Sequence, residues 1–153
     1  MKKTDLAYFA GFFDGEGCIC IRKRKPVNPE NRAWNPIYYL QVSAVNTNEW
    51  VVQQLHFSFG GSISTKQRQA PHRRCWVWLI CARQAGSFLK AVLPYLHVKK
   101  AQAEIALQFQ QAILHGVGKG QARQRTRLSE EAVAVREAQK ILVSNLNHQQ
   151  EGK

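Results

Sequence analysis

The stretch YFAGFFDGEG, residues 8–17, restricts the possible folds more than any other part of the chain. On a helix, three small residues share one narrow face: Ala7, Ala10 and Gly11. Three large apolar residues form a second face: Leu6, Phe9 and Phe13. Glycine inside a helix costs about 0.5–1 kcal/mol relative to alanine, so a close neighbour must offset that loss. A second helix is the natural neighbour of the small face.

Two carboxylates, Asp14 and Glu16, lie between glycines at the end of this helix. The helix dipole is negative there and disfavours an unpaired acid by about 0.3–1 kcal/mol. A divalent cation would compensate, because Glu16 and the carbonyl of Gly15 offer hard oxygen ligands, and waters and phosphates complete an octahedral Mg²⁺ shell. Alternatively, the two acids cap turns and pair with nearby lysines or arginines. The residues alone favour neither interpretation.

The composition indicates one globular domain that meets a polyanion. The chain has 153 residues, 44% of them hydrophobic, and a net charge of +12. No acidic residue occurs between Glu49 and Glu104, whereas lysines and arginines are frequent there. Nucleic acid is the first candidate partner and an anionic membrane surface the second. No apolar run reaches the roughly 18 residues of a membrane span, and the N-terminus lacks the features of a secretory signal.

The four cysteines do not suggest a metal site. They are Cys18, Cys20, Cys75 and Cys81, and they form no C-x-x-C pair. All four lie in strand-like segments rather than in turns, so we expect buried free thiols instead of a zinc site.

Periodicity and capping signals predict an α+β fold. Thr4 is expected to cap a helix from about Asp5 to Phe13, which the glycines then end. The further predicted elements are strands at 18–25 and 37–45, a helix capped by Asn46 or Thr47 that runs through Phe57, strands at 61–68 and 73–81, and helices at 83–92, 98–115 and 129–146. The order αββαββα forms a core at about 5–115, and residues 116–153 form a helical extension of the same domain. The glycine-containing stretch 116–127 lacks the spacing of a phosphate-binding loop.

Strand alternation sorts the side chains of the predicted strands onto two faces. The residues expected to face the helices are Ile19, Ile21, Leu40, Val42, Cys75, Val77, Leu79 and Cys81. The residues expected to face outward and bind DNA are Arg22, Arg24, Tyr39, Gln41, Ser64, Lys66, Arg68, Arg74, Trp76 and Trp78, and Ser43 and Ser62 are expected to face outward beside them. Arginine and glutamine match base edges, and lysine binds phosphate. A solvated sheet is the alternative, and the two tryptophans would also suit stacking on single-stranded bases.

The segment FAGFFDGEG, residues 9–17, resembles the LAGLIDADG motif of a family of homing endonucleases. Ala10, Gly11, Asp14 and Gly17 stand as they do in the motif, and Glu16 replaces its last aspartate. The αββαββα order is also that of the family, and LPYLHVKKAQA, residues 93–103, resembles the segment that carries a lysine near the scissile phosphate. The resemblance covers about residues 5–115 and implies a twisted antiparallel four-stranded sheet.

The resemblance implies roles for individual residues. Glu16 corresponds to the metal-binding acid and Gly15 to the carbonyl ligand beside it. Lys99 corresponds to the basic residue at the phosphate, and Asp14 to the first acid of the motif, which is mainly structural. The segment SAVN, residues 43–46, has no clear equivalent of the polar residue with which the family orders water.

The resemblance also implies a function and an assembly. The expected activity is Mg²⁺-dependent cleavage of both strands of a long DNA site, with Mn²⁺ or Ca²⁺ as other cations for the metal sites. The family's site is built from two motif helices, and this chain of 153 residues has one motif. We therefore expect a homodimer with Ala7, Ala10 and Gly11 at its interface, and a near-palindromic target. The alternatives are a DNA-binding protein without activity, an intron maturase that binds RNA, and a basic single-strand binder.

Overall fold

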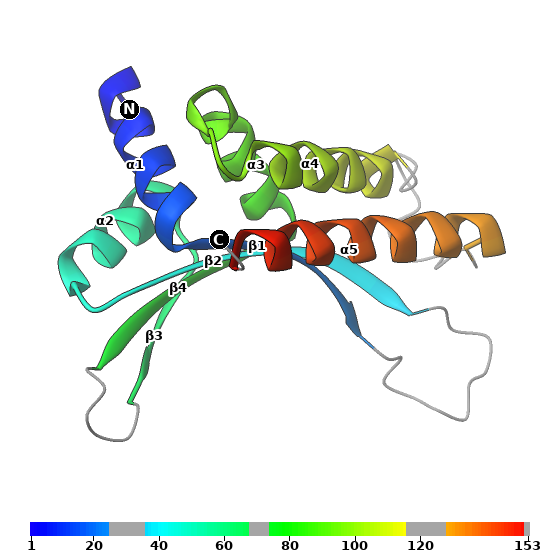
Figure 1. Cartoon of the computed structure of the whole chain (residues 1–153), viewed down its shortest axis with the longest axis horizontal. Coiled ribbons are helices and arrows are strands. Elements are labelled where there is room, and N and C mark those ends of the chain that lie inside the picture. The colour runs from blue at the N-terminus through cyan, green and yellow to red at the C-terminus, as the bar shows by residue number, and fades with distance from the viewer. Residues whose placement is uncertain (25–35, 68–73, 116–127, 152–153) are drawn as a thin grey trace.

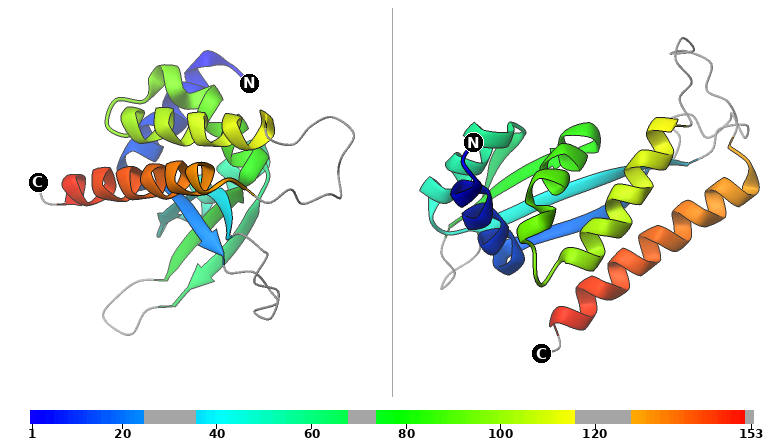
Figure 2. Two further views of the ribbon diagram at one scale, coloured as in Figure 1. Left: turned by 90° about the vertical axis from the view of Figure 1, so that its right-hand side faces the viewer. Right: turned by 90° about the horizontal axis from the view of Figure 1, so that it is seen from above.

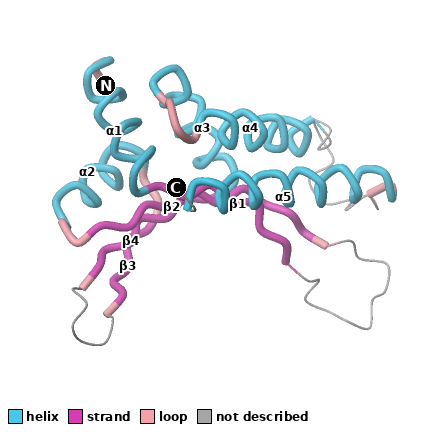
Figure 3. Tube along the Cα trace, viewed as in Figure 1, coloured by secondary structure: helices cyan, strands magenta, loops and turns pink. Residues whose placement is uncertain are grey.

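The computed structural model of the chain describes residues 1–24, 36–67, 74–115 and 128–151. Its elements are α1 (Lys3–Glu16), β1 (Gly17–Arg24), β2 (Ile37–Asn46), α2 (Glu49–Phe59), β3 (Ser62–Lys66), β4 (Cys75–Cys81), α3 (Ala82–Val92), the short 3₁₀ helix η1 (Leu93–Tyr95), α4 (Lys100–His115) and α5 (Glu130–Glu151). The predicted αββαββα order with additional C-terminal helices is confirmed (Figures 1 and 3). The predicted connections at 26–29 and 69–72 and the stretch 116–127 lie outside the described residues.

The four strands form one antiparallel sheet in the order β1-β2-β4-β3. The helices cover one face of this sheet, and the opposite face carries no element of the described chain (Figures 1 and 2). We call that second surface the open face. Buried residues from α1 to α5 and from three strands form a single hydrophobic cluster under the helices. None of the described helices is long and apolar enough to span a bilayer.

The prediction for β4 was wrong in its phase. Trp78 pairs with Ala44 of β2, whose side chain is fully buried, so Trp78 faces the helices. Its ring packs against Phe88 with centroids 5.1 Å apart, and its indole N–H donates to the carbonyl of Gly60 at 2.8 Å. Trp76 lies on the same side and is partly buried against the core. The residues of β4 on the open face are Cys75, Val77, Leu79 and Cys81.

The error has a physical cause in the sequence of this strand. CWVWLIC carries no charged or strongly polar residue, so both of its faces are apolar and alternation cannot choose between them. The pairing with β2 decides the phase, because the alternation of β2 places Leu40, Val42 and Ala44 in the core.

Two helix ends also differ from the prediction. The α1 helix begins at Lys3, with Lys2 rather than Thr4 at the N-cap, and it continues through Gly15 to Glu16. Glycine lowers helix stability by only about 1 kcal/mol, and contacts to the last turn exceed that cost. Gly17 is the extended C-cap, and only glycine fits there because a Cβ would lie 2.3 Å from the Phe13 ring. The α2 helix is capped by Asn48, whose side chain accepts from the amide of Trp50 at 3.0 Å.

The α5 helix covers the edge strand β1. The side-chain amide of Asn147 donates to the carbonyl of Ile19 at 2.9 Å, which satisfies an acceptor of that edge. Glu137 accepts from Lys140, Lys23 and Tyr38 at 2.6, 2.8 and 2.5 Å. These hydrogen bonds, that of Lys140 first, lower the pKa of Glu137 to about 2. The predicted extension therefore contacts the core by apolar packing and by these polar links.

Candidate functional site

Glu16 ends α1 with an exposed side chain. The amide of Gly17 bonds to the carbonyl of Phe13 and the chain then enters β1, which leaves the carbonyl of Gly15 without a helical partner. Carboxylate and carbonyl oxygens are hard donors, and the negative end of the helix dipole favours a cation. Glu16 and Gly15 thus fit a divalent cation. The described residues, the end of α1 included, contain no cluster of three or more His, Cys, Asp and Glu that would suit a metal.

Asp14 holds the segment that carries Lys99. Its carboxylate accepts from the backbone amide of His97 at 2.8 Å and from that of Lys99 at 2.9 Å. The ammonium group of Lys99 returns to the carbonyl of Asp14, which satisfies another orphan carbonyl of the helix end. Asp14 is therefore a structural anchor in this chain, because both of its carboxylate oxygens bind backbone amides.

Lys99 is 8% exposed, which is unusual for a lysine. Burial lowers its pKa, and the charges of Asp14, Cys18 and Glu16 act in the opposite direction. The ammonium group of Lys99 reaches the carbonyl of Asp14, two residues before Glu16, although Lys99 comes from a distant part of the sequence. The structure thus brings together the acid and the base that the sequence analysis selected.

We expect Asp14→Asn to destabilise the fold and to misplace Lys99. An amide offers one acceptor oxygen where the carboxylate uses two, so one charge-assisted hydrogen bond is lost, worth about 1.5–3 kcal/mol. Urea unfolding followed by circular dichroism measures this loss. Asp5→Asn is the matched control, since Asp5 also accepts a backbone hydrogen bond, from Lys2, but lies at the exposed start of α1. Equal stability of the two variants would contradict the anchoring role.

The small face of α1 differs in part from the prediction. Ala10 is fully buried in the hydrophobic cluster, so it is not available to a second chain. Ala7 and Gly11 are exposed as expected, and Thr4 and Gly15 extend the same exposed stripe. Thr4, Ala7, Gly11 and Gly15 follow the spacing i, i+3, i+7 and i+11, which is typical of one helix face. The sequence would have predicted this face if the opposite, apolar face had been centred on Phe9 and Phe13. A Cβ at Gly11 would have no atom within 4 Å in this chain.

The open face carries most of the predicted contact residues of β1, β2 and β3. The pairing of the strands places there Arg22, Arg24, Tyr39, Gln41, Ser43, Ser62, Ser64 and Lys66. Arg22, Arg24, Ser62, Ser64 and Lys66 are exposed, and the remaining three are half-buried. Arg68 lies outside the described residues. The guanidinium of Arg74 lies 5.3 Å from the centre of the Trp76 ring, so Arg74 and both tryptophans belong to the helix side instead.

The SAVN segment lies beside the end of α1, because Ala44 pairs with Gly17. Ala44 is fully buried, and Ser43 and Val45 lie on the open face. The side chain of Asn46 accepts from the amide of Asn48 at 2.8 Å, so it serves the start of α2. Ser43 is the polar side chain of this segment on the open face, and the sequence analysis did not single it out for a role near the metal ligands.

Comparisons with known proteins agree with this geometry. The model of the LAGLIDADG endonuclease family matches residues 9–114. The homing endonuclease I-CvuI, crystallised with DNA and magnesium, matches with 19% identity and a TM-score of 0.67, over 94% of this chain and 82% of that chain. The homing endonuclease I-TnaI matches with 16% identity and a TM-score of 0.64, over 96% of both chains.

The archaeal intron-encoded homing endonuclease I-Vdi141I, in complex with DNA, matches with 14% identity and a TM-score of 0.61, over 92% of this chain and 99% of that chain. No curated protein matches the chain. The family match spans most of the sequence and includes the acid at the end of α1 and the four strands of the sheet. The chain therefore belongs to the LAGLIDADG endonuclease family.

Proposed function

We propose that the chain is a site-specific endonuclease which, as a homodimer, makes a double-strand break in a long, near-palindromic DNA target with Mg²⁺ or a related divalent cation. The main support for this proposal is the set of groups that meet where α1 joins β1. An exposed carboxylate, a carbonyl without a helical partner and a buried lysine meet there, at the border of a basic open face. The relatives crystallised with DNA, magnesium and calcium support the same reading.

In this proposal each part of the site has a separate task. Glu16 and the Gly15 carbonyl hold the cation, whose chemistry is to activate water and stabilise charge at the phosphate. Asp14 fixes the segment around Lys99, and Lys99 offsets the negative charge that develops on the phosphate. The open face binds the duplex, with arginine and glutamine at base edges and lysine at phosphates. A second chain supplies the other Glu16.

The test uses the purified chain and a library of duplexes built on partly randomised palindromes. Cleavage in Mg²⁺ that stops in EDTA, with products cut on both strands, supports the proposal. A DNA-binding protein without activity, or a maturase, would bind duplex DNA or RNA and cut neither. A single-strand binder would prefer unpaired oligonucleotides and would not depend on Glu16.

Lys99→Met should lower the cleavage rate by about 10²–10³-fold, because it removes a charge that acts mainly in the transition state. The dissociation constant for DNA in Ca²⁺ should stay within a few fold. Lys100→Met is the matched control, since it removes the same charge from the adjacent, exposed position. Single-turnover kinetics separate rate from binding. Equal losses in rate and in affinity would make Lys99 an ordinary phosphate contact.

Arg22→Ala should weaken recognition at particular base pairs by about 1–3 kcal/mol, because a bidentate contact to a base edge is lost. Lys90→Ala, which removes an exposed charge from the helix layer, is the control. Cleavage of a library of single-base variants of the target, read by sequencing, measures the effect. A uniform loss across all sequences would assign Arg22 to the phosphate backbone instead.

A further inference from the structure

Cys18 and Cys20 form a close pair of thiols on the open face. They are two residues apart in β1, so both side chains lie on the same face, opposite Ser43 and Gln41. Side chains at this spacing start about 6.6 Å apart along a strand. The two sulfur atoms are nevertheless only 3.3 Å apart and share a hydrogen bond. The side chains are therefore already turned toward each other.

The surroundings of the pair favour a thiolate at Cys20. The hydrogen bond with Cys18, followed by the charge of Arg22, lowers the pKa of Cys20 against the effect of burial. The thiolate is the form of cysteine that attacks disulfides, and Cys18 is next to it as a second thiol. Cys81, by contrast, has its pKa raised by burial.

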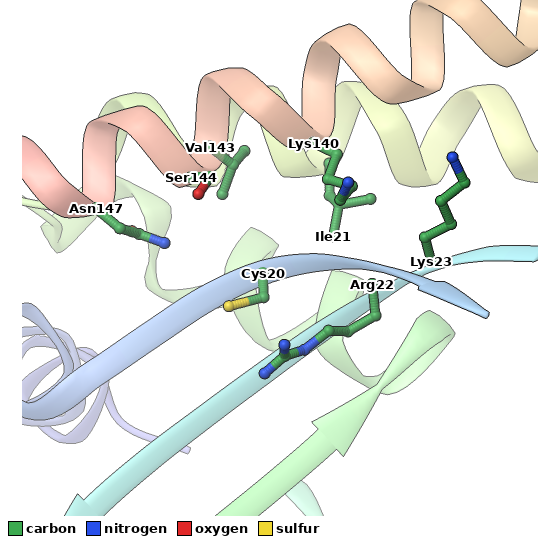
Figure 4. A pocket seen from close by; sticks show the side chains of 8 residues that line it. All are labelled: Cys20, Ile21, Arg22, Lys23, Lys140, Val143, Ser144 and Asn147. Carbon is green, nitrogen blue, oxygen red and sulfur yellow. The ribbon is translucent and has the colours of Figure 1, made fainter.

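Small reagents can reach this pair. Both thiols are half-buried rather than enclosed. Cys20 lines a groove of about 430 Å³ between β1 and α5, together with Arg22, Lys140, Ser144 and Asn147 (Figure 4). The cations that border this groove favour the approach of an anionic reagent.

We propose that Cys18 and Cys20 are a reversible thiol-oxidation site, at which a low-molecular-weight disulfide closes an intrastrand Cys18–Cys20 bond that switches DNA cleavage off. The Cys20 thiolate attacks one sulfur of the small disulfide, forms a mixed disulfide and releases one small thiolate. That thiolate takes the proton of Cys18, whose sulfur then attacks Cys20 Sγ and expels the second small thiolate. The protein loses two electrons, and the small disulfide gains them.

The position of the bond explains its effect. Residues two apart in a strand have Cα atoms about 6.6 Å apart, close to the upper limit of about 6.8 Å for a disulfide, and their Cβ atoms start further apart than the roughly 3.5–4.5 Å that the bond requires, so the backbone must move. Closing the bond therefore pinches β1 at its start, directly after Glu16 and Gly17. Such a change would shift the end of α1 that carries Glu16, and cleavage would fall. This effect on activity rests on the proposed function. A bond under such strain is also easily reduced, so the switch is reversible.

The test treats the full chain with oxidised glutathione and then with dithiothreitol. The oxidised parent should lose about 2 Da without a glutathione adduct, and peptide mapping should place the bond between Cys18 and Cys20. Cleavage of target DNA in Mg²⁺ should fall about 10–100-fold and recover after reduction. Cys20→Ser should form no such bond and should keep its cleavage rate under oxidant. Cys75→Ser combined with Cys81→Ser keeps the pair and should respond like the parent.

Three results would overturn the proposal. The first is an unchanged mass or a stable glutathione adduct on the parent, and the second is an oxidised parent, with the bond mapped, that cuts as fast as the reduced one. The third is a Cys20→Ser protein that loses activity under oxidant as the parent does. A reduced parent that cuts no DNA would overturn the proposed function and the switch with it, whereas the mass measurement would still decide whether the two thiols pair.

Discussion

Glu16→Gln should abolish DNA cleavage while the affinity for target DNA stays within a few fold. The substitution keeps the size of the side chain and its exposed position at the end of α1, but it removes the carboxylate that we propose as the charged ligand of the cation. A neutral amide oxygen holds Mg²⁺ far more weakly than a carboxylate does. Without the cation, the protein loses both the activated water and the stabilisation of charge at the phosphate. The expected decrease is at least about 10³-fold, measured as the single-turnover rate in Mg²⁺.

Glu131→Gln is the matched control for this experiment, because it makes the same change of charge at an exposed position in the first turn of α5. It should cut at the rate of the parent. Fluorescence anisotropy in Ca²⁺ measures DNA affinity for both variants. A Glu16→Gln protein that cuts like its parent in Mg²⁺ would remove Glu16 from the metal site.

Gly11→Leu should separate the two chains of the proposed homodimer and thereby stop cleavage. Gly11 lies on the exposed stripe of α1 with Ala7 and Gly15, and an added side chain meets no atom of its own chain. The isolated fold should therefore tolerate leucine, which also favours the helix by about 0.8 kcal/mol or more over glycine. Between two closely packed helices, however, the same side chain has no room. Multi-angle light scattering should give a monomer for the variant and a dimer for the parent.

The effect on stability distinguishes an interface from a damaged fold. Thermal unfolding of monomeric Gly11→Leu should remain cooperative, and its far-UV spectrum should match that of the parent. Ala134→Leu, which adds similar bulk to the exposed surface of α5, should stay dimeric and active. A Gly11→Leu protein that dimerises and cuts normally would rule out the contact between the two α1 helices.

The sequence predicted which face each side chain occupies in strands that are polar on one face and apolar on the other. In β1, Ile19 and Ile21 alternate with the two cysteines and Arg22, so the sides of Ile19, Ile21, Arg22 and Arg24 were predicted correctly. In β4, every position is apolar or a cysteine, and only the pairing with β2 determines which tryptophan enters the core. Tertiary contacts of this kind are not encoded in the periodicity of a single strand.

The candidate site followed from the motif more than from local physics. The helix dipole indicated that Asp14 and Glu16 need positively charged partners, but it did not distinguish a bound cation from pairing with nearby lysines or arginines. The structure separates the two acids, because Asp14 binds backbone amides 83 and 85 residues further along the chain and Glu16 stays exposed. Such a distant partner cannot be read from the spacing of the motif. The proximity of Cys18 to Cys20 was visible in the sequence, whereas the orientation of their sulfur atoms was not.

The long separation between Asp14 and Lys99 has a consequence for synthesis on the ribosome. The hydrogen bonds between them join residues 85 positions apart, so they cannot form before the segment after η1 has left the exit tunnel. By then α1, the four strands and α3 have been made, and the nascent chain can already collapse around its aromatic core. Closing so long a loop is slow compared with local helix formation. A growing chain therefore carries the complete motif helix while about 80 further residues are added, before its lysine is made.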